Sequence, residues 1–418
     1  MHVCIFEDEQ YLNFEPLIYP RPVYDLVCGV NSLKEKILRA FPKDKVILHC
    51  RKYLEEIVKV ENPGFKVNEF LNDDILFING RVIADSNLNQ ILSKKIVGEK
   101  VFTLGNNIIA ARLSADSVDK LRKQSNDVIH SNFFNGIAAE EIKVNCANYI
   151  WDLIYLNGTE LQNDIRNIIK QKKIKKADKK KYKGVHFLDQ KNIYINKNVV
   201  IKPGVVIDAS NGPVYIDKNV LISSNAVIEG PVYIGEGTKI KSFASIYSNV
   251  SIGKICKIGG EVEDSIIHPY TNKQHPGFLG HSYLGSWINI GADTNCSDLQ
   301  NNYGTVKVQI NGRHIDSGKQ FLGLIMGDHT KTAINTMFNT GTVAGFSANI
   351  FGAGFPPKYI PSFGWGGSDS IKLYKLSKAL ETAKVVFKRR DVLFESKDEK
   401  LFEKIFELTQ KDREIRGF

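Results

Sequence analysis

Isoleucine recurs every six residues through the second half of the chain. Eight isoleucines stand at consecutive positions of this period: Ile216, Ile222, Ile228, Ile234, Ile240, Ile246, Ile252 and Ile258. Ile195, Ile201 and Ile207 form an earlier run in the same period, before a three-residue shift near 211–213. Such a period matches neither a helix, at about 3.6 residues per turn, nor the alternation of a strand. It predicts a triangular coil in which every sixth side chain points into one shared core.

The residues between the isoleucines agree with this coil. They are mainly Gly, Pro, Asn, Ser and Lys, which suit tight corners. A β-sandwich would instead show alternation with longer, irregular turns. The period is lost between Glu261 and Leu279, and again from about Asp293 to Gly327. Excursions from a rigid solenoid often carry binding residues, so we expect the functional site in these two interruptions.

In the first half of the chain, short apolar runs alternate with stretches whose apolar residues have helical spacing. Apolar runs at 3–6, 46–49, 75–78 and 101–104 predict strands, and 32–40 and 118–124 predict helices. This alternation favours an α/β domain with a mostly parallel sheet. We expect that domain at 1–169, a Lys-rich linker at 170–192 and the β-helix domain at 193–368. The remaining residues, 369–418, predict a C-terminal helical segment packed across the β-helix or a neighbouring subunit.

The net charge of +10 has a local origin. Residues 170–183 read KQKKIKKADKKKYK, with nine lysines against one aspartate. We interpret this run as a solvated linker or helix face, with an anion-binding patch as the alternative; nucleic acid is not an expected partner.

No run of 18 apolar residues and no signal peptide stands out, so we expect a cytoplasmic protein that does not enter membranes. The six cysteines are scattered without CxxC spacing, which argues against a disulfide framework or zinc knuckle.

The first interruption holds three histidines, His268, His275 and His281. Histidine is a common zinc ligand, but these spacings fit any surface loop, and we expect no metal here. A histidine acting as general base fits better, because acyl transfer to an amine requires removal of a proton as the nucleophile attacks. A Gly-rich coil edge could supply donors to the tetrahedral intermediate.

Three motifs of this region, GGEVEDSII, NKQH and FLGHSYLGSWINIGADT, resemble the acetyltransferase domain of the bifunctional sugar-1-phosphate nucleotidylyltransferase/acetyltransferases. These include bacterial N-acetylglucosamine-1-phosphate uridyltransferases and their archaeal relatives. The family pattern EV-K-x-S, H-L-S-Y-x-G-D, N-I-G-A can be laid on this chain without a gap from Glu261 through His275 to Ala292. The resemblance implies a left-handed β-helix, acetyl-coenzyme A as acyl donor, an amino sugar phosphate or sugar nucleotide as ligand, and a homotrimer.

The same resemblance implies residue roles. His275 takes the place of the catalytic histidine, and His281 is the alternative if the alignment slips so that His281-Ser282-Tyr283 forms the motif. The implied substrate-binding residues are Glu261, Lys273, Tyr283, Asn289, Lys307 and Lys331, and the implied coenzyme-binding residues are Gly291 and Ala292. The chain departs from the pattern at Phe278, where the family has a tyrosine, and at Glu263, where it has a phosphate-binding lysine. A glutamate beside a sugar phosphate would repel it.

The first half resembles the nucleotidyltransferase domain of the same enzymes. PLIYPRPVYDLVCGVNSLKEKIL resembles the stretch with a Lys-Pro pair before the first helix, and DDILFINGRVI resembles the strand that ends in a magnesium-binding aspartate. The implied nucleotide-binding residues are Arg21, Lys36 and Asn79. Arg81 stands in the place of the aspartate, and the Gly-rich phosphate loop has no counterpart after Phe6. We therefore expect Mg²⁺ only if this domain is active; the alternative is a non-catalytic sugar-nucleotide sensor on a trimeric scaffold.

Overall fold

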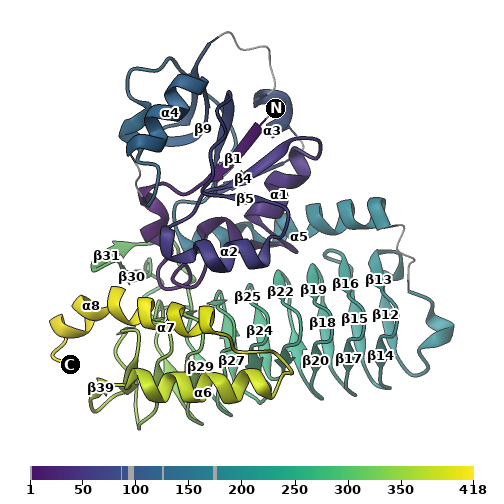
Figure 1. Ribbon diagram of the computed structural model, residues 1–418. Helices are drawn as coiled ribbons and strands as arrows, with labels where there is room; N and C mark the ends of the chain where they lie inside the picture. The colour runs from purple at the N-terminus through teal and green to yellow at the C-terminus, as the bar shows by residue number, and fades with distance from the viewer. Residues whose placement is uncertain (1, 86, 93–97, 125–126, 173–176) are drawn as a thin grey trace.

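The computed structural model describes residues 2–85, 87–92, 98–124, 127–172 and 177–418. An α/β domain stands on one side of a long β-helix, and the C-terminal helices lie along the same β-helix at the end far from its first coil (Figure 1). Within these described ranges no helix is both long and apolar enough to cross a membrane.

The N-terminal domain contains a seven-stranded sheet in the order β10-β8-β9-β6-β1-β4-β5. Its strands are β1 (His2–Phe6), β4 (Lys45–Leu48), β5 (Lys66–Val67), β6 (Ile75–Asn79), β8 (Lys100–Leu104), β9 (Asn107–Leu113) and β10 (Ala139–Glu141). Pairing is parallel except where β9 meets β6 and β8. The four strands predicted from sequence are therefore confirmed, as is the mostly parallel sheet.

Helices cover both faces of this sheet. They are α1 (Leu33–Ala40), α2 (Glu55–Glu61), α3 (Leu88–Leu92), α4 (Ala115–Gln124) and the long α5 (Ile150–Lys172). Short pieces complete the domain: β2 (Val27–Cys28), β3 (Asn31–Ser32), β7 (Val82–Ile83), β11 (Asn145–Cys146), and the 3₁₀ turns η1 (Glu9–Phe14), η2 (Val23–Asp25), η3 (Lys52–Leu54) and η4 (Ser131–Phe134). All five residues of β6 are buried, as expected for a strand covered on both faces. The predicted helices at 32–40 and 118–124 are confirmed.

The β-helix is a three-sided prism of parallel sheets, and each coil visits the three in turn. The first sheet contains β12 (His186–Leu188), β15 (Val206–Asp208), β18 (Val227–Glu229), β21 (Ser245–Ile246), β24 (Glu261–Glu263), β27 (Phe278–Gly280), β29 (Asn295–Cys296) and β34 (Met337–Phe338). The second contains β13 (Ile193–Ile195), β16 (Val214–Ile216), β19 (Val232–Ile234), β22 (Val250–Ile252), β25 (Ile266–Ile267), β28 (Tyr283–Leu284), β32 (Ile325–Met326), β35 (Val343–Ala344) and β37 (Tyr359–Ile360). The third contains β14 (Val200–Ile201), β17 (Leu221–Ile222), β20 (Lys239–Ile240), β23 (Lys257–Ile258) and β26 (Asn272–Lys273), then β33 (Lys331–Thr332), β36 (Asn349–Ile350) and β38 (Gly364–Gly366). At its end β39 (Ile371–Leu373) pairs antiparallel with β38.

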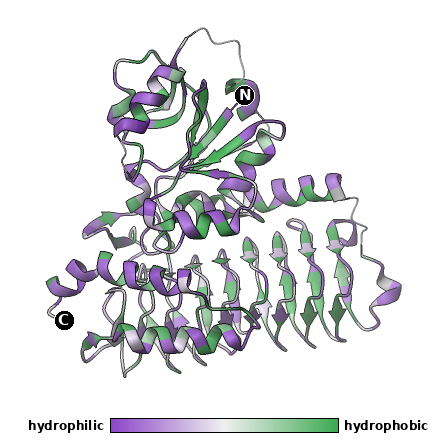
Figure 2. Ribbon diagram, viewed as in Figure 1, coloured by the Kyte–Doolittle hydropathy of each residue, from purple (hydrophilic) through white to green (hydrophobic). Residues whose placement is uncertain are grey.

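The isoleucine period is the core of this prism. Ile216, Ile222 and Ile228 point inward from the second, third and first sheets, so one coil uses one isoleucine per side. All eight isoleucines from 216 to 258 are fully buried, which confirms the predicted coil. Figure 2 shows apolar residues gathered in the strands, with polar residues at the corners and on the outer sides of the C-terminal helices.

The two interruptions of the period have different structures. Lys239 and its partner Lys257 are 18 residues apart, whereas Lys257 and its partner Asn272 are 15 apart. The chain between Glu261 and Leu279 therefore continues as shortened coils, and the expected excursion there is wrong. The second interruption is an excursion: β30 (Lys307–Ile310) and β31 (Arg313–Asp316) form an antiparallel hairpin between β29 and β32.

The ends of the β-helix differ from the expectation in detail. The first coil begins at β12, inside the segment expected as linker, and 3₁₀ turns η5 (Lys179–Lys181) and η6 (Gln190–Asn192) flank that strand. Part of the lysine run, 173–176, lies outside the described residues, and its first lysine belongs to α5. The C-terminal segment folds into three helices, α6 (Leu376–Lys388), α7 (Ser396–Leu408) and α8 (Gln410–Ile415). Phe346 and Phe363 of the β-helix share a core with α6 and α7, so the predicted packing across the β-helix is confirmed.

The two halves share one apolar cluster. Phe14 and Trp151 of the first half pack with Ile266, Tyr283 and Val343 of the second sheet. Polar contacts join the same surfaces: the Tyr283 hydroxyl donates to Val27 O at 2.9 Å and accepts from Val27 N–H at 2.8 Å. The domains are thus held in a fixed relation.

Candidate functional site

His275 lies on the edge of the prism where each coil passes from the third sheet to the first. We call this the His275 edge; its corners are residues 241–244, 259–260, 274–277, 291–294 and 333–336. The His275 side chain is exposed. Gly277 has φ +114°, and a Cβ there would lie 2.1 Å from Thr294 O, so only glycine fits. The backbone next to the imidazole is therefore rigidly placed.

Lys273 fixes this corner from inside the coil. Its side chain is 2% exposed, and its ammonium donates to the carbonyl oxygens of Gly259 (2.9 Å), His275 (3.3 Å) and Gly277 (2.6 Å). Burial lowers the pKa of Lys273 to about 8. The sequence suggested a substrate contact for this lysine, whereas its contacts in the structure are to the backbone that carries His275.

Several other predicted residues share the His275 edge or border it. Gly291 and Ala292 form the corner of the next coil, where Asp293 N–H donates to Pro276 O at 3.1 Å. The Gly291 N–H donates to Thr332 Oγ1 at 2.9 Å. Asn289 is exposed and bridges Asn272 and Lys331 in the third sheet, and Glu261 faces Phe278 across the first sheet. These positions lie on the His275 edge or in the strands that border it.

Two cations near this edge have contrasting surroundings. Lys331 donates to His329 O at 2.7 Å, and burial lowers its pKa to about 8. Lys241, which the motifs did not single out, is exposed at the corner beside Gly259: a Cβ on that glycine would lie 3.2 Å from Lys241 Cβ and 2.6 Å from Gln274 O. Lys241 is therefore a cation in the neighbourhood of His275, identifiable only once the coils are stacked.

Three predicted residues lie elsewhere. His281 sits on the edge between the first and second sheets, where its Nδ1 is 2.8 Å from Asp298 Oδ2 and its ring stacks on Phe321 at 5.1 Å. Tyr283 is fully buried, and its hydroxyl also contacts His268 Nε2 at 2.9 Å. Lys307 is exposed on the hairpin strand β30.

The three histidines fall on three different edges of the prism. His268 is buried between the second and third sheets, His275 is exposed on its own edge, and His281 is half-buried on the remaining edge. They therefore do not form a common metal site. A different group brings ligand atoms within 4.8 Å of one another: Glu263, His281 and Asp298. Burial, and then the charge of Asp298, raises the pKa of Glu263.

Ion pairs fill the carboxyl ends of β1 and β6 in the N-terminal sheet. Arg81 is fully buried and binds both oxygens of Asp8, with Nε–Oδ1 at 3.1 Å and Nη2–Oδ2 at 2.7 Å. Asn79 Nδ2 also donates to Asp8 Oδ2 at 2.7 Å. Arg51 binds the two oxygens of Glu7 at 3.1 and 3.3 Å. Mg²⁺ needs carboxylate oxygens that are free to coordinate it; these residues do not fit the cation that the resemblance implied.

Two predicted nucleotide-binding residues are engaged in buried ion pairs. The Arg21 guanidinium donates to Asp328 of the β-helix, with Nη1–Oδ1 at 2.9 Å, and that charge raises the Arg21 pKa against the opposing effect of burial. Lys36 is fully buried between Glu160 (2.6 Å) and Asp164 (2.7 Å) of α5. Arg21 thus ties the domains together, and Lys36 ties α1 to α5.

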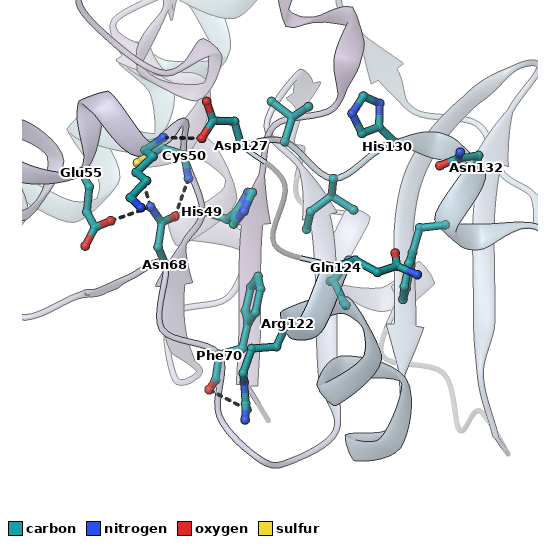
Figure 3. A pocket seen from close by; sticks show the side chains of 15 residues that line it. His49, Cys50, Glu55, Asn68, Phe70, Arg122, Gln124, Asp127, His130 and Asn132 are labelled. Carbon is teal, nitrogen blue, oxygen red and sulfur yellow. Dashed lines mark hydrogen bonds between the residues drawn. The ribbon is translucent and has the colours of Figure 1, made fainter.

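A pocket of about 360 Å³ opens at the carboxyl ends of β4 and β5, where Cys50 of its lining precedes Arg51 of the Glu7–Arg51 pair. Figure 3 shows His49, Asn68, Gln124, His130 and Asn132 around it. The sequence reading placed His49 in a strand; β4 ends at Leu48, so His49 stands at the carboxyl edge. A histidine directly after a parallel strand is the signal that could have revealed this pocket.

Comparison with known proteins gives the chain a family. A model described as sugar nucleotidyl transferase matches residues 3–173. A structure of Francisella novicida UDP-N-acetylglucosamine acyltransferase aligns at 15% identity with a TM-score of 0.28, covering 54% of this chain and 87% of its own. The bifunctional protein GlmU of Methanocaldococcus jannaschii is 28% identical over 396 residues, or 89% of each chain. The bifunctional protein GlmU of Methanococcus maripaludis is 31% identical over 360 residues, covering 80% of this chain and 83% of the relative. At this identity and coverage, the chain belongs to the GlmU family of bifunctional transferases.

Proposed function

We propose that the β-helix transfers an acetyl group from acetyl-coenzyme A to the amine of an amino sugar phosphate, with His275 as general base. The observation that carries this proposal is the exposed imidazole on a backbone corner that Lys273 fixes from inside. Gly291 and Ala292 lie on the adjacent corner. A base beside a backbone-lined edge suits acyl transfer.

In the reaction, the amine nitrogen attacks the thioester carbonyl carbon while His275 accepts the amine proton. The C–N bond forms and the C–S bond breaks, and the coenzyme A thiolate leaves and takes up a proton. The Gly291 N–H already donates to Thr332 Oγ1. We therefore assign the contact with the tetrahedral oxyanion to the Ala292 amide.

The charge distribution supports a phosphorylated acceptor. Lys241 places an exposed cation two coils from His275, at roughly 10 Å for a strand spacing of about 4.8 Å. Glu263, which the sequence placed beside the sugar phosphate, ends β24 next to His281 and Asp298 on another edge. The repulsion expected from Glu263 is thereby reduced.

The oligomer we propose is a homotrimer that closes around the His275 edge. Phe243 and Ile334 lie on this edge with 73% and 68% of their surface exposed, and Phe351, 40% exposed and directly after β36, extends the same edge by one coil. Exposed apolar side chains along one line mark an interaction surface. A closed ring would bury all three copies of this edge and place a neighbouring chain against each His275.

Thiol release from acetyl-coenzyme A tests the acetyl transfer, with glucosamine-1-phosphate and unphosphorylated glucosamine as acceptors. We expect release with the phosphorylated acceptor, its loss in His275→Ala, and its retention in the matched variant His314→Ala, which changes an exposed histidine of the hairpin. Activity retained in His275→Ala but lost in His281→Ala would transfer the role of base to His281. A folded oligomer that releases no thiol with any amino sugar would overturn the proposal in favour of a scaffold.

Nucleotidyl transfer by the N-terminal domain is a second candidate, favoured by the family match over residues 3–173. Pyrophosphate formation from a nucleoside triphosphate and a sugar-1-phosphate tests it. We derive no step through Mg²⁺, because Asp8 and Glu7 are held by Arg81 and Arg51.

A further inference from the structure

Three successive coils send side chains to one place on the edge between the first and second sheets. Glu263 ends β24, His281 directly follows β27, and Asp298 follows β29. Neighbouring strands are about 4.8 Å apart, so the backbones of Glu263 and Asp298 stand two spacings, or roughly 10 Å, from each other. Their ligand atoms nevertheless lie within 4.8 Å of one another and of the imidazole. The two carboxylates therefore converge on the histidine between them.

The backbone and an aromatic ring hold this arrangement in place. A Cβ on Gly280, the partner of Glu263 in the first sheet, would lie 2.3 Å from Asp298 Oδ2, so the missing side chain gives the carboxylate its room. The His281 ring is fixed from the other side by its stack on Phe321. Ligand atoms that rigid strands and packed rings position in advance favour ion binding.

A further carboxylate orients the imidazole. His281 Nδ1 faces Asp298 at 2.8 Å, while its Nε2 is 3.8 Å from Asp264 Oδ2. Asp264 is itself held, because Asn249 Nδ2 donates to its Oδ1 at 2.8 Å. A histidine that binds a metal through one ring nitrogen usually directs its other N–H to a carboxylate, backbone carbonyl or water. The Asp264 side of the ring has this supporting arrangement, and the Nδ1 side has the converging carboxylates.

The charges at this place do not balance. Even with a protonated imidazole, the three carboxylates leave an excess of two negative charges. The His281 and Asp298 side chains are only 15% and 10% exposed, so water screens this repulsion incompletely. Lys319, which follows the hairpin, has its ammonium 4.3 Å from the centre of the Tyr155 ring. A divalent cation would supply the two positive charges that offset the excess.

We propose that Glu263, His281 and Asp298 bind one zinc ion, through the imidazole Nδ1 and one oxygen of each carboxylate. One nitrogen and two oxygen ligands suit zinc, whereas magnesium and calcium prefer oxygen alone. Three protein ligands leave the fourth position of a tetrahedral ion to water or another small ligand. The assignment makes His281 a metal ligand and leaves the role of base to His275, and zinc binding is independent of acetyl transfer.

Isothermal titration of the full-length protein with zinc chloride tests the proposal, after treatment with EDTA and dialysis. We expect saturable binding of one ion per chain, and a thermal midpoint that rises with the zinc concentration because the folded chain binds the ion. X-ray absorption of the zinc-loaded protein should show nitrogen and oxygen neighbours at about 2.0–2.2 Å and no sulfur at about 2.3 Å. Titration without saturable binding, or sulfur around the ion, which would indicate cysteine ligands, would overturn the proposal.

The variants Glu263→Gln and Asp298→Asn identify the site. Each removes one charged ligand at nearly constant size, so zinc affinity should fall at least as much as for the loss of an outer-shell partner, about tenfold to hundredfold. The thermal midpoint without zinc checks that both variants fold. The matched control is Glu229→Gln: Glu229 ends β18, two coils earlier on the same sheet, and glycine follows it. The control should bind zinc as the wild type does. Unchanged affinity in both site variants would place the ion elsewhere, and an equal loss in the control would show diffuse attraction to an acidic edge; either result refutes the site.

Discussion

The buried Lys273 allows activity and stability to be separated by one substitution. Its pKa is lowered from 10.5 to about 8 by burial. At about 1.4 kcal/mol per pKa unit, charging this side chain inside the coil costs about 3 kcal/mol near neutral pH. Its three hydrogen bonds to carbonyl oxygens contribute about 1 kcal/mol each. In Lys273→Met both effects disappear, so the free energy of unfolding should change by less than about 1 kcal/mol.

The corner that carries His275 loses its internal support in the same variant. A displaced base lowers turnover, so kcat for acetyl transfer should fall roughly tenfold to hundredfold. Urea denaturation and the thiol-release assay measure the two effects on one preparation. A loss of more than about 3 kcal/mol in unfolding free energy, or an unchanged kcat, would refute this reasoning.

The pH dependence of stability gives an independent check. Between pH 8 and 10.5 the unfolded chain keeps the Lys273 proton while the folded chain releases it, so this lysine contributes a rise of stability with pH in this window. Lys331, with its pKa also lowered to about 8 by burial, contributes a rise of the same sign. Buried cysteines such as Cys28 and Cys296, whose pKa values are raised by burial, contribute a fall in the same window, so the quantity to measure is the difference in stability between variant and wild type. The stability of Lys273→Met relative to that of the wild type should therefore fall as the pH rises from 8 to 10.5, whereas a constant difference would show that this lysine does not titrate there.

Two further perturbations address the interfaces. Arg21→Met leaves the carboxylate of Asp328, which is 2% exposed, without its partner, and should lower the free energy of unfolding by about 3–5 kcal/mol in urea titrations; a loss below about 1 kcal/mol would mean that the domains do not depend on this pair. Ile334→Asp places a charge on the His275 edge and should convert the proposed trimer to monomers in light scattering, whereas Leu393→Asp, at a site 80% exposed and on another surface, should leave the mass unchanged. Equal masses for both variants would exclude this edge as the interface.

The β-helix could be predicted from the sequence because its six-residue isoleucine period is a local pattern. Each inward position, such as Ile234 or Ile252, is set by a repeat that needs no knowledge of distant residues. The shortened coils after Lys257 were misread for the same reason: a corner that loses residues breaks the period without ending the coil. Periodicity reports spacing along the chain and cannot distinguish a shorter turn from an excursion.

The candidate site could be predicted only in part, because charged side chains pair with residues that are far away in the sequence. Arg21 pairs with a residue 307 positions away, and Lys36 with residues 124 and 128 positions away. Arginine and lysine can each bind either a phosphate or a carboxylate, so the sequence could not reveal that these two residues pair with carboxylates. His275 and Gly291 could be placed near one another because the motif that carries them spans a single coil.

The apolar cluster shared by the two halves has a consequence for how the chain is made. Phe14 and Trp151 leave the ribosome long before Ile266, Tyr283 and Val343, the residues that cover them. During synthesis the first half therefore carries an uncovered apolar face until most of the β-helix has been produced. A chain that ends after α5 would expose the same apolar surface permanently and should aggregate readily. Because each half covers apolar residues of the other, replacing one half by that of another protein would require a matching change in the contact surface of the other half.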